Sequence, residues 1–222
     1  MFAASCTNPQ EEGRERPPAS SPGSPAASAA PLPNLESVDT ATTSKTAPDA
    51  LPNAPDADDV VTSAQAPNSR LAGETFALKL SQLVIDVRDD IDIKKVVAEI
   101  ASDELPNEEQ DALVYEVTSQ HASGLGRRWK TEEPMWIRSV TEGPANTPRR
   151  VNVEIAGVLA VGDPDYVGWN KIRIDVVRES DSWRLIKLSA SPFRPDDLSV
   201  NRATVKLGDY LEGPGWREIA PS

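Results

Sequence analysis

The sequence predicts an α+β domain in which helices come first and an antiparallel sheet follows, behind a long segment without a folding pattern. Three observations lead to this prediction. Large apolar residues are scarce before residue 70. From there to about residue 120 they recur every three or four positions, and after residue 129 they alternate with polar residues. Short turns between alternating strands indicate antiparallel neighbours, and helices followed by such a sheet are α+β.

The first 70 residues differ in composition from the rest of the chain. They hold 11 of the 20 prolines and a single aromatic residue, Phe2, whereas all five tryptophans and all three tyrosines lie beyond them. Without large apolar side chains a segment cannot offset the entropy of ordering its backbone. The predicted organisation is a disordered Pro/Ala/Ser-rich linker at 7–69, a folded domain at 70–193 and an extension at 194–222 that docks on the domain.

Three amphipathic helices are predicted at the start of the domain. The first covers about 70–87. Asp90 or Asp92 caps the second. The third begins after Asn107, which forms a capping-box pattern with Gln110. Their apolar faces are Phe76, Leu80, Leu83, Val84 and Val87; Ile93, Val96, Val97 and Ile100; and Leu113, Val114 and Val117.

Four strands are predicted after the helices, at about 135–140, 150–161, 167–178 and 183–191, because apolar and polar residues alternate there. Turn residues separate them, so the strands form a meander of consecutive antiparallel neighbours. The predicted core packs Ile155, Ile172, Ile174, Val176, Ile186 and Leu188 against Leu80, Leu83, Val96 and Val117.

The order of these elements resembles the NTF2-like superfamily, whose cone-shaped fold wraps a curved sheet around helices. Trp183-Arg184-Leu185, directly after the last turn, matches a pattern seen at the last hairpin of many members. The resemblance covers about 71–193 and implies a cavity between the sheet and the helices. It also implies where chemistry would lie, since some NTF2-like enzymes use an Asp or a Tyr deep in the cone.

Few residues offer catalytic chemistry. His121 is the only imidazole, and we interpret it as a residue that interacts with the end of the third helix, with a base at a cavity mouth as the alternative. Glu154 and Asp175 fall out of phase with the core and are interpreted as cross-strand charge pairs at the surface. Tyr115 is a better cavity candidate but stands alone. We therefore predict no catalytic constellation and no cofactor, and one His with one Cys cannot supply a typical zinc site.

The net charge is 23 − 35 = −12, which repels phosphate and excludes nucleic acid as an expected partner. The glycines at 124 and 126 precede a strand rather than a helix, so they do not form a phosphate loop. We interpret the basic residues at 127–130 and 149–150 as solvated loops, with one joint patch that contacts anionic lipid or an acidic partner as the alternative. The candidate contact residues are Arg127, Arg128, Trp129, Lys130, Arg149, Arg150, Trp169 and Trp216.

Small residues precede the single cysteine in the sequence Ala3-Ala4-Ser5-Cys6. This resembles the end of a bacterial lipoprotein signal peptide, in which the Cys is lipidated. Ala3 stands where an aliphatic residue is usual, and no basic or apolar region precedes it. Three interpretations stay open: residues 1–6 are the remnant of a signal that begins upstream, Cys6 is incidental in a cytosolic tail, or it is a redox-active thiol. We favour the first, because the linker would tether a surface-anchored domain.

Taken together, these features predict a non-enzymatic interaction or assembly module. It would be lipid-anchored on the outer face of a bacterial cell membrane, and its layout resembles that of accessory proteins of envelope, secretion or conjugation systems. One alternative is a small-ligand-binding protein or a cone-fold enzyme of the isomerase or dehydratase kind. Another is a cytosolic scaffold with a disordered tail.

Overall fold

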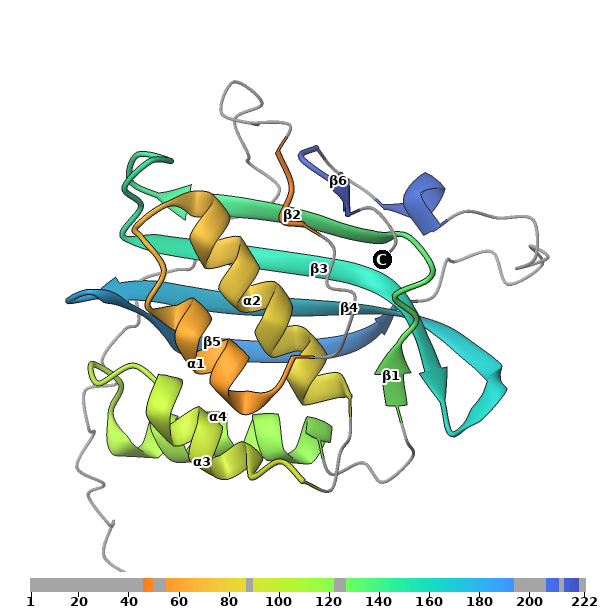
Figure 1. Cartoon of the computed structure of the whole chain (residues 1–222), viewed down its shortest axis with the longest axis horizontal. Helices are drawn as coiled ribbons and strands as arrows, with labels where there is room; N and C mark the ends of the chain where they lie inside the picture. The colour runs from red at the N-terminus through yellow and green to blue at the C-terminus, as the bar shows by residue number, and fades with distance from the viewer. Residues whose placement is uncertain are drawn as a thin grey trace, which may run out of the picture. The chain divides into compact units, whose positions relative to one another are not determined.

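A computed structural model of the chain describes residues 46–49, 55–86, 90–121, 127–193, 207–211 and 214–219. Within these residues, four α-helices are followed by a six-stranded antiparallel sheet, which confirms the predicted α+β class (Figure 1). The helices are α1 (Ala57–Ala64), α2 (Arg70–Ile85), α3 (Ile93–Ile100) and α4 (Asn107–His121). The strands are β1 (Arg127–Trp129), β2 (Met135–Glu142), β3 (Arg150–Val161), β4 (Asp163–Glu179), β5 (Ser182–Phe193) and β6 (Arg217–Ile219), with a short 3-10 helix η3 at Leu207–Tyr210 before the last.

The sheet is a meander of β2 to β5 with two short strands added, β6 beside β2 and β1 beside the end of β3. The strand order is β5-β4-β3-β2-β6, and β1 pairs with the end of β3 beyond the part that pairs with β2. Strands β2 to β5 are consecutive antiparallel neighbours, as the short turns predicted. At the β5 edge, Ala101 forms an isolated bridge to Leu185. The helical segment therefore covers part of an edge that would otherwise expose unpaired backbone groups.

One face of the sheet, called here the inner face, is covered by helices. Figure 1 shows α2 crossing β3 and β4, and α4 packs against β5. Gly73 of α2 makes this close approach possible, because a Cβ atom there would lie 3.0 Å from a methyl group of Val151. Of the predicted apolar helix faces, Val114 is only partly buried and Val87 lies outside the described residues. The ten residues of the predicted core are buried, with one exception.

Ile186 is that exception, and its predicted place in the core was wrong. A β-bulge shifts the register between β4 and β5, so Asp175 lies opposite Lys187 while Val176 lies opposite Leu185. Ile186 is the extra residue on β5 and is only partly buried. Leu185 and Leu188 both point into the core instead, and both are buried.

Helix α1 lies inside the segment that was predicted to be a disordered linker, so the boundary at residue 69 was wrong. Asp56 caps the helix and forms a capping box with Asp59, in which each carboxylate accepts a hydrogen bond from the other residue's backbone N–H. Val60 and Ala64 lie one turn apart and are buried against α2. Two apolar residues and a good cap are enough to fold this helix onto the domain.

The extension after residue 193 docks on the domain through β6, which pairs with the β2 edge. Ile219 is buried, and the Trp216 ring stacks on the guanidinium of Arg138 at 4.8 Å. Arg217 reaches the buried carboxylate of Glu74 in α2. Glu74 also accepts hydrogen bonds from Arg70 and from the Ser139 hydroxyl, so helix, sheet and extension meet at this one carboxylate.

Candidate functional site

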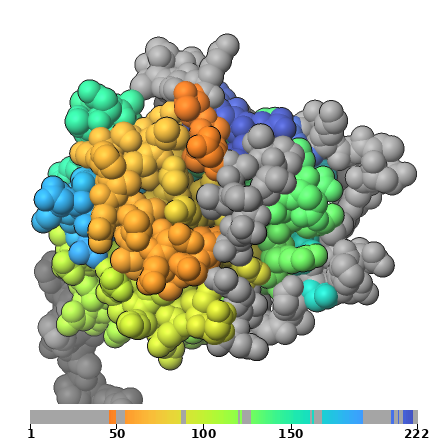
Figure 2. Space-filling model, viewed as in Figure 1, coloured from red at the N-terminus to blue at the C-terminus, as the bar shows by residue number. Residues whose placement is uncertain are grey.

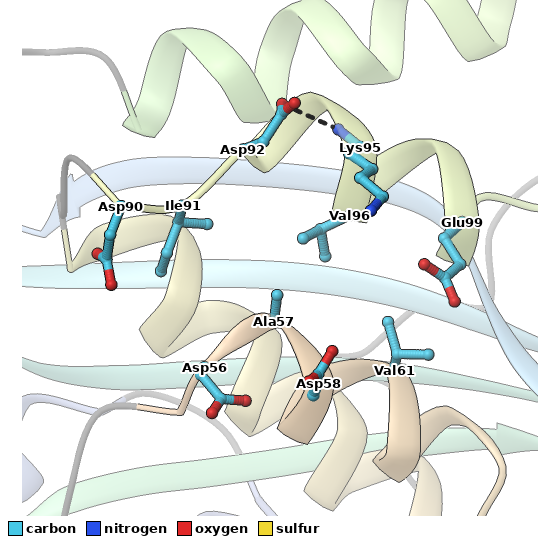
Figure 3. Close-up of a pocket in the computed structure, with 10 residues that line it drawn as sticks. All are labelled: Asp56, Ala57, Asp58, Val61, Asp90, Ile91, Asp92, Lys95, Val96 and Glu99. Atoms are coloured by element: carbon cyan, nitrogen blue, oxygen red, sulfur yellow. Dashed lines mark hydrogen bonds between the residues drawn. The ribbon is translucent and has the colours of Figure 1, made fainter.

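A groove of about 320 Å³ lies between the start of α1 and the segment that leads into α3. Figure 3 shows four apolar side chains pointing into it, two from each side. Carboxylates surround this apolar floor. The floor consists of Ala57, Val61, Ile91 and Val96, and the rim of Asp56, Asp58, Asp90, Asp92, Lys95 and Glu99.

The groove follows directly from how the two helices begin. Asp56 and Asp92 are the N-caps of α1 and α3, each accepting a hydrogen bond from the backbone N–H three residues later. Val60 and Val96 anchor the two helices in the core. The residues beside these anchors, Ala57 and Val61, are left partly exposed and line the space between the helices.

The rim carries a strong negative charge, with five carboxylates against one ammonium group. Asp58, Asp90 and Glu99 form no salt bridge with any residue of the described part of the chain. Nor do the described residues contain a group of three or more His, Cys, Asp or Glu side chains placed to hold a metal ion. The rim carboxylates therefore line an extended surface and do not converge on one point.

The groove belongs to a layer that is acidic as a whole. Residues 55–121, which include all four helices, contain 5 basic and 15 acidic side chains, a net charge of 5 − 15 = −10. Residues 127–193, which form strands β1 to β5, contain 11 basic and 9 acidic side chains, a net charge of +2. Figure 2 shows the helical face, with α1 beside α3. The negative charge of the folded part is therefore concentrated on the helices.

A second polar cluster lies on the outer face of the sheet, opposite the helices. Glu154 of β3 stands between Arg138 of β2 and Arg173 of β4, its register partners, and its oxygens lie 2.5 Å from a guanidinium nitrogen of each. Cross-strand pairing was predicted, but Glu154 was expected at the surface and is 1% exposed. Burial raises the pKa of Glu154, and the hydrogen bonds and charges of Arg173 and Arg138 outweigh this, so the pKa is lowered.

Asp175 is also buried, which corrects the expectation that it lies at the surface. Burial raises the pKa of Asp175, and the charge of Arg150, 3.1 Å away, offsets this only in part. The register partner of Asp175 is Asn152, which is 1% exposed. Within the described ranges, neither amide atom of Asn152 has a hydrogen-bond partner, and neither does Oδ1 of Asp175. The two buried carboxylates therefore sit in different environments, one fully paired and one not.

The basic residues considered for a joint patch lie at opposite ends of the sheet. Trp129 in β1 pairs with Leu159 of β3. Arg150 lies nine residues before Leu159, at the start of β3. At a rise of about 3.3 Å per residue, roughly 30 Å separates the two groups. The Lys130 ammonium also lies 3.6 Å from the carboxylates of Glu132 and of Glu133. The two groups therefore do not form one basic patch, which was the alternative to solvated loops.

The candidate contact residues differ in how much solvent they reach. Arg128 and Arg149 are exposed, whereas burial lowers the pKa of Arg127. The ring of Trp129 is 5% exposed, and its indole N–H donates to the carbonyl of Ser81, so this side chain belongs to the core. The other candidates, Lys130, Arg150, Trp169 and Trp216, are all partly buried.

Of the two residues considered for cavity chemistry, Tyr115 lacks the expected surroundings, and His121 lies in the last turn of α4, the helix end where it was expected. Tyr115 is 75% exposed on α4, so it does not face the interior. His121 is buried at the end of α4, and its Nδ1 has no hydrogen-bond partner in the part of the chain that the structure describes. It forms no ion pair with a carboxylate among the described residues. The pattern of residues along α4 did not predict that Tyr115 is exposed and His121 is buried.

Cys6 lies outside the described residues, as does most of the predicted linker. Among the helices that are described, none has the length and apolar character needed to cross a membrane. Compared with protein-family models, curated proteins and solved structures, the chain shows no significant match.

Proposed function

We propose that this chain is a non-enzymatic interaction module, an NTF2-like domain that binds a partner protein through its helical layer. The observation that supports this proposal best is the groove between α1 and α3, which combines an apolar floor with uncompensated carboxylates. Partly exposed apolar surface rimmed by charge is typical of a protein-binding site. The exposed side chains of Leu71 and Tyr115 add two apolar contacts to the same helical layer.

The surroundings of the titratable groups favour binding over catalysis. Glu154 is bound by two arginines, and Asp175 by one, so neither approaches another carboxylate without an intervening cation. His121, the only imidazole of the sequence, has no described carboxylate beside it to orient it as a general base. An acid–base enzyme needs a proton-transferring group in contact with its substrate, and the described residues present a binding surface more clearly than such a group.

The location is part of the proposal. Lipidation at Cys6 would hold the domain on the outer face of a bacterial cell membrane, and the Pro/Ala/Ser-rich segment would give it reach. To test this, the gene is expressed with its upstream DNA, and the intact mass of protein from washed membranes is measured. A mass that matches cleavage before Cys6 plus acyl chains supports the anchor, and a soluble, unmodified chain that retains Met1 refutes it.

The interaction itself is tested by photo-cross-linking in cells. A photoreactive amino acid replaces Tyr115 on α4 or Leu71 on α2, and a control chain carries it at Lys187, an exposed position of β5. The proposal predicts one defined adduct from the helical positions that is absent or weak from Lys187. If neither helical position forms an adduct, the proposal is contradicted.

A further inference from the structure

We propose that the groove between α1 and α3 binds an extended, basic segment of the partner, with a lysine or arginine side chain lying along its floor. This inference rests on the proposed function and adds to it the chemistry of the partner and the place where it binds. It follows from three features of the groove: its size, its apolar floor and the state of its carboxylates.

The size of the groove suits side chains better than a folded surface. Its volume of about 320 Å³ lies at the lower end of the range of about 300–1,000 Å³ for ligand pockets. Ile91 and Val96 line one side, and Ala57 and Val61 the other. Lysine and arginine bury their hydrocarbon stems against such surface while the charged head stays in a polar rim.

The charge of the rim selects for a cation. Asp90 and Glu99 stand at the two ends of the groove in Figure 3, and Asp58 lies on the α1 side. These three carboxylates form no salt bridge with any other residue that the structure describes. A cationic side chain could pair with them without breaking an existing ion pair. The net charge of −10 on residues 55–121 would also attract a basic chain from a distance and speed its association.

A single metal ion is a poorer match for the same surface. Calcium takes six to eight oxygen ligands at about 2.3–2.6 Å, which requires carboxylates that converge. Within the described ranges no three carboxylates are placed in that way. Carboxylates spread along a groove match charges spread along a polypeptide.

The test measures binding of a fluorescein-labelled decapeptide of alternating lysine and alanine to the full-length chain by fluorescence anisotropy. The same peptide with glutamate in place of lysine is the negative control. The double variant Asp90→Lys/Glu99→Lys reverses the charge at both ends of the groove, and neither residue takes part in a salt bridge within the described structure. Ala57→Leu fills the floor without changing any charge. The matched control Glu109→Lys/Asp111→Lys makes the same charge change on exposed positions of α4 away from the groove.

We expect the lysine peptide to bind the unaltered chain and the glutamate peptide not to bind. Both groove variants should weaken binding by about tenfold or more, and the α4 control by less than about threefold, because general attraction is screened at physiological salt. Equal losses in the two charge-reversed chains, or unchanged binding by Ala57→Leu, would mean non-specific attraction and overturn the proposal. So would the absence of peptide binding, or displacement of the peptide by equimolar spermine, which would indicate a small polyamine ligand. A cross-link from Tyr115 that persists in both groove variants would leave the interaction module intact and refute only this site.

Discussion

Arg217 of β6 and Glu74 of α2 form a buried ion pair, in which Nη2 of the arginine lies 2.5 Å from Oε1 of the carboxylate. The two residues are 143 positions apart, and each side chain is at most 9% exposed. The pair ties the short C-terminal strand to the first long helix. Three residues of backbone pairing would hold β6 weakly, and this ion pair adds to its attachment.

Substitution of Arg217 by Met should release β6 while the rest of the sheet stays folded. Glu74 keeps the hydrogen bonds from Arg70 and Ser139, so its buried charge remains partly compensated. We expect a loss of about 3 kcal/mol in the free energy of unfolding, which is typical of breaking a buried pair. Hydrogen exchange should become faster at 217–219 and at the facing residues 135–137. Arg217→Lys keeps the charge and should recover part of the loss, and unchanged exchange in Arg217→Met would contradict this account.

The two buried carboxylates of the outer face should respond differently to neutral, isosteric replacement. Glu154→Gln leaves Arg138 and Arg173 without their shared counter-charge. Because Arg173 is partly exposed, we expect a loss near the lower end of the range for a buried pair, about 3 kcal/mol. Asp175→Asn removes a charge whose pKa is raised by burial, so its effect at pH 7 should stay within about 1 kcal/mol of zero. Urea unfolding of the two variants at pH 7 checks the contrast, and equal losses would contradict it.

The same two groups should give opposite pH dependences. The folded-state pKa of Glu154 is lowered from 4.5, so its stabilisation is present above about pH 4.5 and is lost as pH falls through the folded pKa. The folded-state pKa of Asp175 is raised from 3.8, so folding favours its protonated form and its contribution improves as pH falls toward 3.8. Unfolding free energies measured between pH 7 and 3.5 should show the cost of Glu154→Gln shrinking at low pH.

For Asp175→Asn the difference should instead move in favour of the unaltered chain as the solution becomes acidic. The pH change acts on both chains in the same way at every other group, so the difference between them isolates Asp175. Parallel pH curves for the two chains would show that this carboxyl titrates as it does in the unfolded state.

The helices and strands could be predicted because their apolar residues repeat with the period of each element. Asp92 and the apolar face from Ile93 to Ile100 define α3, and the alternation from Val151 to Ile155 defines the inner face of β3. Period alone cannot detect a bulge, which is why Ile186 was misplaced. It also overlooks α1, whose signal is a capping box at Asp56 and Asp59 with only two buried apolar residues behind it.

The candidate groove could not be predicted from the sequence for a related reason. Its floor joins Ala57 and Val61 of an overlooked helix to Ile91 and Val96 of a predicted one. For the outer face of the sheet, the prediction from alternating apolar and polar residues had the opposite weakness. It assigned Glu154 correctly to the face away from the helices, but equated that face with solvent, whereas burial depends on what else covers it. Pairing with neighbouring arginines follows from register, and burial does not.

Replacement of Asn152 by Val should stabilise the domain. Asn152 is the third residue of β3, and both of its amide atoms are buried without a hydrogen-bond partner among the described residues, which costs about 1–3 kcal/mol in desolvation. Valine removes that cost and suits a strand better, so we expect a gain of about 1 kcal/mol in the free energy of unfolding by urea. Asn152→Ala removes the amide without adding the methyl groups of valine. Comparison of the two variants therefore separates the effect of losing the amide from the effect of gaining hydrocarbon. Destabilisation by both changes would mean that an ordered water molecule satisfies the amide in solution.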